Sequence, residues 1–210
     1  YGRSAKAVAA QLKIPVSEAE DIQDALFRMM PGARRWIEDR HYEADTTGKI
    51  VTPTGRVRDL RMYTNTGDRH RRAVNTPIQG GASDLTLWAT GHIHKWMKRE
   101  KIKSSLWGFV HDSIMFDFFP QEFEMLMIGS EHYFSVETPK AFPWYNVPLV
   151  LEFECGPDWK NLVEVSYSRS DRSVAFEGDA ENITIVSDAL SGVLGEQRLD
   201  PEWITKITHK

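Results

Sequence analysis

Two apolar segments separated by a short polar turn constrain this chain more than any other feature of its sequence. Residues 106–110 and 114–118 are rich in aromatic and aliphatic side chains, and His111-Asp112 lies between them. Apolar runs of this length around a tight polar turn predict a β-hairpin, here over residues 104–119. The tip of such a hairpin would hold the Asp112 side chain on a rigid platform.

The Asp112 carboxylate is open to two interpretations. Aspartate is common in turns, so His111-Asp112 can be a plain hairpin turn. A carboxylate between two buried strands is costly, however, unless a charged group meets it. Phosphoryl-transfer sites use aspartates to bridge two divalent ions about 4 Å apart, and Mg²⁺ prefers such oxygen ligands. One aspartate supplies only part of such a site.

The rest of the chain predicts helices before and after this hairpin. Helical spacing and capping signals, including a capping box formed by Ser17 and Glu20, predict helices at 3–12, 17–29, 33–44, 77–100 and 120–135. Strand-like patterns occur at 49–60 (a hairpin), at 147–154 and at 183–186. This order predicts an α+β fold, with an antiparallel sheet packed against helices.

Charge and composition narrow the class of partner. The chain has 210 residues and a formal net charge of −4, which excludes a surface coated in basic residues. Basic side chains gather instead in 56–72 and 95–103, which suits a protein that grips a phosphate backbone on one face, although solvated helix faces give the same pattern. One cysteine excludes an internal disulfide and fits a reducing cytosol. No apolar run approaches the roughly 18 residues that cross a bilayer, so no membrane partner is expected.

Six short motifs occur in a fixed order along the chain. They are Tyr1-Gly2 with Ser4, Phe27-Arg28 with Pro31-Gly32, Thr52 with Gly55-Arg56-Val57-Arg58, the run 71–80 with Asp84, Val110-His111-Asp112, and Val147-Pro148-Leu149 with Glu152, Gly156 and Trp159. In this order and spacing the motifs resemble the C-terminal part of family A DNA polymerases, the bacterial polymerase I type. The resemblance covers about residues 1–160.

The resemblance implies part of a right-hand polymerase. Residues 1–70 would be a helical remnant of the fingers with a small hairpin, and residues 71–165 would be the palm with its antiparallel sheet. Residues 166–210 do not resemble the family and would form a C-terminal extension. The implied reaction is template-directed addition of deoxynucleotides to a primer 3′ end by two-metal phosphoryl transfer, in a bacterial cell or a phage-infected host.

The resemblance also implies roles for individual residues. Asp112 would be a catalytic Mg²⁺ ligand, His111 would lie near the primer 3′ end, and Arg71 would contact the DNA backbone. The remaining expected DNA-binding residues are Tyr1, where the templating base arrives, its neighbour Gly2, and Asn75 and Gln79, along the minor groove. Amides at that position can bond the acceptors that every correct base pair presents in the minor groove. Gly80 and Gly81 would let the duplex approach closely.

Two expectations concern what lies outside this sequence and which enzyme it belongs to. The second metal-binding aspartate of the family lies upstream of Tyr1, so activity is expected to need an upstream polymerase half, as in a split phage-type polymerase, together with primer–template DNA and dNTP. The family usually has Glu where Ser113 stands here. His-Asp-Ser is frequent in single-subunit RNA polymerases, which are the first alternative. A polymerase-derived subunit that binds DNA without catalysis is the second.

Overall fold

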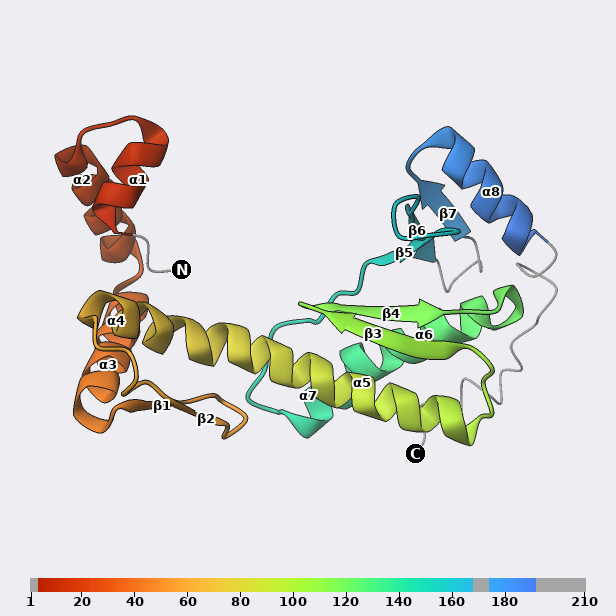
Figure 1. Cartoon of the computed structure of the whole chain (residues 1–210), viewed down its shortest axis with the longest axis horizontal. Helices are drawn as coiled ribbons and strands as arrows, with labels where there is room; N and C mark the ends of the chain where they lie inside the picture. The colour runs from red at the N-terminus through yellow and green to blue at the C-terminus, as the bar shows by residue number, and fades with distance from the viewer. Residues whose placement is uncertain (1–3, 168–173, 192–210) are drawn as a thin grey trace. The chain divides into compact units, whose positions relative to one another are not determined.

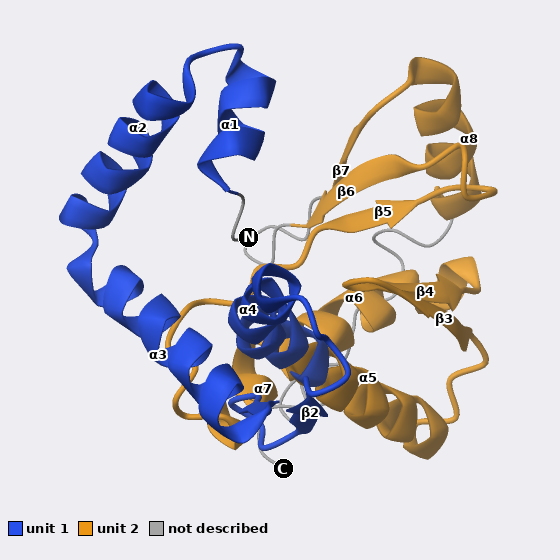
Figure 2. Ribbon diagram, turned by 60° about the vertical axis from the view of Figure 1, so that its left-hand side comes forward, with its two compact units in different colours: residues 1–84 blue, residues 85–210 orange. Residues whose placement is uncertain are grey.

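The computed structural model describes residues 4–167 and 174–191. The chain divides into two compact units, Tyr1–Asp84 and Leu85–Lys210, which are coloured separately in Figure 2. The division falls inside one helix, α5 (Gly81–Arg99). The expected fingers, palm and extension with boundaries at 70 and 165 remain a prediction.

Helices and one small hairpin make up the first unit. The helices are α1 (Ala5–Leu12), α2 (Val16–Met29), α3 (Pro31–Thr47) and α4 (Thr66–Asn75). The expected capping box is wrong, because α2 begins at Val16 with Pro15 in the capping position and Ser17 falls inside the helix. Gly48, with φ 68°, ends α3 and leads into the hairpin.

The hairpin of the first unit consists of β1 (Lys49–Val51) and β2 (Val57–Asp59), paired antiparallel. Ile50 and Leu60 are fully buried and pack with Ala44 and Ala73 into a small core. Along the chain, α4 continues into a π-helical turn, η1 (Thr76–Gly80), and then into α5. The expected long helix therefore forms, with a π-helical turn at its beginning.

The second unit is built around the predicted hairpin, which consists of β3 (Ser105–Val110) and β4 (Ser113–Asp117). A register shift between Leu106 and Gly108 makes Trp107 an extra residue on β3. Helix α5 and helix α6 (Phe123–His132) pack against the hairpin through a core that contains Trp96 and Leu126 (Figure 1). The short elements η2 (Pro120–Glu122), η3 (Tyr133–Glu137) and α7 (Thr138–Ala141) flank α6.

A three-stranded antiparallel sheet completes the second unit. Its strands are β5 (Phe153–Cys155), β6 (Val163–Tyr167) and β7 (Val174–Glu177), in the order β5-β6-β7. Most of the expected strand at 147–154 is irregular, since β5 includes only its last two residues. The fold class is α+β, as the sequence predicted.

The expected strand at 183–186 is wrong, because these residues lie in helix α8 (Ala180–Leu190). Asp179 caps this helix by accepting hydrogen bonds from two backbone amides of its first turn. Ile183, Val186 and Leu190 follow helical spacing and pack into the core beneath the sheet. Among the described residues, no helix combines the length and hydrophobicity that a bilayer crossing requires.

Candidate functional site

The turn between β3 and β4 has a strained geometry. Val110 pairs with Ser113, so the turn consists of His111 and Asp112 alone. His111 has φ 56°, and Asp112 is not among the residues of positive φ. A positive φ at the first turn residue only is the pattern of a type II′ turn, which normally has glycine there. The fold thus keeps a histidine in a conformation that side chains disfavour.

The Asp112 side chain is exposed, and so is that of His111. The expectation of a buried carboxylate that needs a charged partner is therefore wrong, because the hairpin side chains that pack against α5 and α6, such as Leu106, Ile114 and Phe116, leave the tip uncovered. Within residues 4–167 and 174–191, no group of three or more His, Cys, Asp or Glu side chains could hold a metal ion. Asp112 can offer one carboxylate ligand at an open edge.

The base of this hairpin is fixed by Glu122. Its carboxylate accepts hydrogen bonds from the backbone amide of Lys103 at 2.9 Å and from the amide and hydroxyl of Ser104 at 2.7 and 2.6 Å. Burial raises the pKa of the Glu122 carboxyl, but these hydrogen bonds outweigh it and hold the pKa below its ordinary value. The Ser104 hydroxyl also accepts a hydrogen bond from the Phe119 amide, which joins both ends of the hairpin.

In the first unit, a cavity of about 370 Å³ brings together side chains from the β1–β2 hairpin, α4 and η1. Asn75 and Gln79, two of the residues singled out by sequence, line it together with Arg56 and Arg58. The Asn75 side-chain oxygen is buried and has no hydrogen-bond partner among the described residues. Arg58 donates to the Thr76 hydroxyl at 3.2 Å. The lining thus includes amide and guanidinium groups, which carry N–H donors, together with the Asp59 carboxylate.

A carboxylate beside this cavity holds the hairpin tip, and sequence reasoning assigned it no role. Asp84 accepts hydrogen bonds from the hydroxyls of Thr52, at 3.1 Å, and of Thr54. It also forms an ion pair with Arg56 at 2.9 Å. The Arg56 guanidinium donates to the Gly80 carbonyl oxygen at 3.3 Å. We call this set, Thr52, Thr54, Arg56 and Asp84, the hairpin clamp. Thr52, Arg56 and Asp84 occur in the motifs quoted above, which is the signal that could have revealed the clamp, whereas Thr54 lies between motif positions.

The hairpin clamp explains Gly80. A Cβ at this position would lie 2.9 Å from Thr52 Cγ2 and 3.2 Å from Arg56 Nη2. The close approach that the glycine pair indicated is made at Gly80 by the protein's own hairpin. The approach of a DNA duplex to these glycines remains a prediction. Gly81 is less constrained, since a Cβ there would make an ordinary contact of 3.4 Å with Pro53.

Arg71, the expected backbone contact, projects from α4 with its side chain about half exposed. Its guanidinium is paired with Asp68, which also accepts from Arg72 at 3.2 Å. Hydrogen bonds from these arginines, foremost that of Arg72, lower the pKa of Asp68. The Arg72 guanidinium lies 4.1 Å from the centre of the Tyr63 ring, which fixes it by a cation–π contact.

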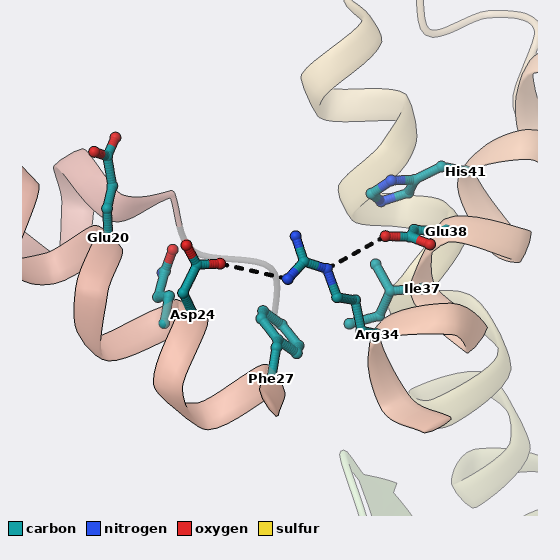
Figure 3. Close-up of a pocket in the computed structure, with 8 residues that line it drawn as sticks. Glu20, Asp24, Phe27, Arg34, Ile37, Glu38 and His41 are labelled. Carbon is teal, nitrogen blue, oxygen red and sulfur yellow. Dashed lines mark hydrogen bonds and ion pairs between the residues drawn. The ribbon is translucent and has the colours of Figure 1, made fainter. Parts of the chain in front are cut away.

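A second cavity, of about 420 Å³, lies between α2 and α3 in the first unit. Figure 3 shows the Arg34 guanidinium between Asp24 and Glu38, and each ion pair measures 3.4 Å. All three side chains are more than half exposed, so these pairs contribute little stability. No sequence motif assigned a role to this cavity.

The family model for "DNA polymerase family A" matches residues 1–161 of this chain. The chain belongs to this family. The match includes both the β3–β4 turn and the cavity with Asn75 and Gln79, and it confirms the resemblance seen in the sequence.

Curated relatives include DNA polymerase I of Chloroflexus aurantiacus, 30% identical over 166 residues, and a DNA polymerase of Bacillus phage SP01, 26% identical over 181 residues. The alignments cover 77% and 79% of this chain, but only 17% and 19% of the relatives. The chain thus spans less than a fifth of the length of these family A polymerases.

A solved structure of similar fold is the POL domain of Pol1 from M. smegmatis in complex with DNA primer-template and dNTP. It superposes with a TM-score of 0.62 and is 28% identical, over 70% of this chain and 26% of that one. Of the residues expected at the site, Tyr1 and Gly2 lie outside the described residues. Arg71, Asn75 and Gln79 belong to the first unit of this family A chain, and His111 and Asp112 to the second.

Proposed function

We propose that this chain supplies part of the active site of a template-directed DNA polymerase, which adds deoxynucleotides to a primer 3′ end in a bacterial cell or a phage-infected host. The observation that carries the proposal is the β3–β4 turn, where two residues expose the Asp112 carboxylate and His111 adopts a positive φ. Strain of this kind often accompanies a functional site. The family match supports the same reading.

Asp112 suits a Mg²⁺ ligand in the proposed enzyme. Mg²⁺ keeps several waters and is held by one or two carboxylates plus substrate phosphates, so one exposed aspartate on a firm hairpin fits part of such a site. The bound ions would offset the charge that develops on the transferred phosphate. Since Asp112 is a single carboxylate, we propose that a second one comes from polypeptide outside this sequence, and that this chain does not polymerise DNA alone.

The first unit would hold the primer–template duplex. Asn75 and Gln79 would direct amide groups to minor-groove acceptors of the newest base pairs, and the half-exposed Arg71 would exchange its Asp68 partner for a backbone phosphate. His111, which precedes the metal ligand, would lie at the primer terminus. Tyr1 would pack where the templating base arrives, and its neighbour Gly2 would also contact the DNA.

Primer extension tests the proposal. The assay uses this chain alone and together with a second polypeptide that supplies the rest of the polymerase domain, with Mg²⁺ and a primed template. We expect extension only in the combined reaction, and a loss of at least about 100-fold with Asp112→Asn, the scale of removing one group that stabilises transition-state charge in a preorganised site. Asp39→Asn, which makes the same change at an exposed position on α3, serves as the control.

Three outcomes of this assay would count against parts of the proposal. Extension by the chain alone contradicts the need for a second polypeptide. Undiminished synthesis with Asp112→Asn contradicts the metal-ligand role and favours a subunit that binds DNA without catalysis. A preference for ribonucleotides over deoxynucleotides would favour the RNA polymerase alternative, which Ser113 raised.

A further inference from the structure

We propose that Asp84 is a positioning residue for Gln79, and that it acts through the hairpin clamp to give the polymerase its discrimination between matched and mispaired primer ends. This inference rests on the proposed function. It assigns a role to a carboxylate that would itself touch neither metal nor substrate.

Arg56 connects Asp84 to the backbone beside Gln79. Asp84 Oδ1 pairs with Arg56 Nη2 at 2.9 Å, and the same nitrogen donates to the Gly80 carbonyl oxygen at 3.3 Å. The Asp84 side chain is only 14% exposed, so this ion pair is shielded from water on the carboxylate side. The carboxylate therefore sets the position of a guanidinium that holds the residue next to Gln79.

The segment that Arg56 holds is η1, and its conformation is unusual. Gln79 lies in η1, a π-helical turn, and two glycines follow it. π-helical turns are rare and glycine destabilises helices, so this segment needs support from outside itself. A change from i→i+5 to i→i+4 hydrogen bonding would rotate Gln79 about the helix axis and turn its amide away from the cavity wall.

The tip of the β1–β2 hairpin fits closely against the π-helical turn η1. Thr52 is 4% exposed, and its hydroxyl lies within hydrogen-bond distance of Asp84, of the Thr54 hydroxyl and of the Arg56 amide. A Cβ on Gly80 would already collide with the Thr52 methyl group, so little space separates tip and turn. Movement of the tip would consequently reach η1 directly. The clamp thus links a carboxylate on α5 to the orientation of an amide that faces the cavity.

Duplex binding tests the inference independently of catalysis. The full chain is titrated with a primer–template duplex whose 3′ end is either paired or mispaired, and the ratio of the two Kd values is measured by fluorescence anisotropy. We expect Gln79→Ala and Asp84→Asn each to reduce this ratio by about 3- to 10-fold, the range for loss of one hydrogen bond. The Gln79→Ala/Asp84→Asn double variant should match the single variants, because Asp84 acts through Gln79. Asp39→Asn, an exposed aspartate on α3, is the matched control.

A role for Asp84 in stability alone would not produce this pattern. Losses that add in the double variant, or an unchanged ratio with Asp84→Asn or with Gln79→Ala, overturn the inference. These results would not contradict the proposed polymerase function, because Asp112→Asn tests that function separately. Failure of the unmutated chain to bind either duplex would also overturn the inference. If Asp84→Asn does not fold, Thr54→Val and Arg56→Lys take its place, and both should lower the ratio in the same direction.

Discussion

The two hairpins of this protein are fixed at opposite ends. The β1–β2 hairpin is held at its tip, where Asp84 binds Thr52, Thr54 and Arg56. The β3–β4 hairpin is held at its base, where Glu122 binds the backbone of residues 103 and 104 and leaves the tip with Asp112 exposed. A tip bound to its own protein serves as scaffold, whereas a tip left free can meet a ligand.

Each tip contains a residue of positive φ, but only in the exposed β3–β4 tip is that residue not a glycine. The bound tip places Gly55 at φ 91°, where glycine adopts the conformation at little cost. The free tip places His111 at φ 56°, where a side chain is disfavoured by about 1–2 kcal/mol. Strain is therefore found at the tip to which we assign chemistry, and not at the tip that only supports the fold.

The largest expected effect comes from the base of the second hairpin. Glu122→Ala removes the acceptor of three hydrogen bonds and leaves the amide of Ser104, a residue 5% exposed, without its partner. We expect the free energy of unfolding to fall by about 2–4 kcal/mol, since donors of charge-assisted hydrogen bonds are left buried. Urea denaturation measures this, with the exposed neighbour Gln121→Ala as the control. Equal losses for the two variants would contradict the role of Glu122 at the base of this hairpin.

The pH dependence sharpens this prediction. The folded-state pKa of Glu122 lies below its ordinary value of 4.5, so its contribution to stability is present above that pH. The contribution is lost as the pH falls through the lowered pKa, because the unfolded chain binds the proton more readily. Stability of the unmutated chain should therefore fall more steeply in acid than that of Glu122→Gln. Parallel curves would show that the carboxylate charge does not matter.

The next effect tests how tightly the first hairpin fits. Gly80→Ala introduces a Cβ 2.9 Å from Thr52 Cγ2, and the hydrogen bonds that the Thr52 hydroxyl donates to Asp84 and accepts from the Arg56 amide limit its retreat. We expect a loss of about 1–3 kcal/mol, the usual range for overpacking. Gly32→Ala, whose Cβ would meet nothing within 4 Å, is the control and should cost nothing. A neutral Gly80→Ala would mean that the tip moves freely, which contradicts the clamp.

The smallest effect exchanges the backbone character of the two tips. His111→Gly should gain about 1 kcal/mol of stability, because glycine adopts a positive φ without strain. Gly55→Ala should lose about as much, because it places a side chain at a positive φ. A Cβ on Gly55 has open space around it, so its loss would be due to the backbone alone. Thermal unfolding of both variants measures the exchange. If His111→Gly gains nothing, the strain at the free tip is absent in solution.

Local patterns in the sequence were enough to predict the β3–β4 hairpin, its two-residue turn and the long helix that includes α5, but not that this helix continues from α4 without a break at Thr76. They failed at residues 183–186, where β-branched side chains suggested a strand and Asp179 instead starts a helix. Helical spacing of Ile183 and Val186 satisfied the core equally well, so packing decided between the two.

The sequence by itself determined the family, through ordered motifs, and the presence of Asp112 at a polar tip between apolar strands. Only the tertiary structure decided that this carboxylate is exposed, that Gly80 accommodates a hairpin, and that Asp84 holds Thr52 from a position 32 residues away. The physical reason is that periodicity and turn chemistry act over a few neighbouring residues. Hydrogen bonds and close contacts between distant segments depend on how those segments fold against one another.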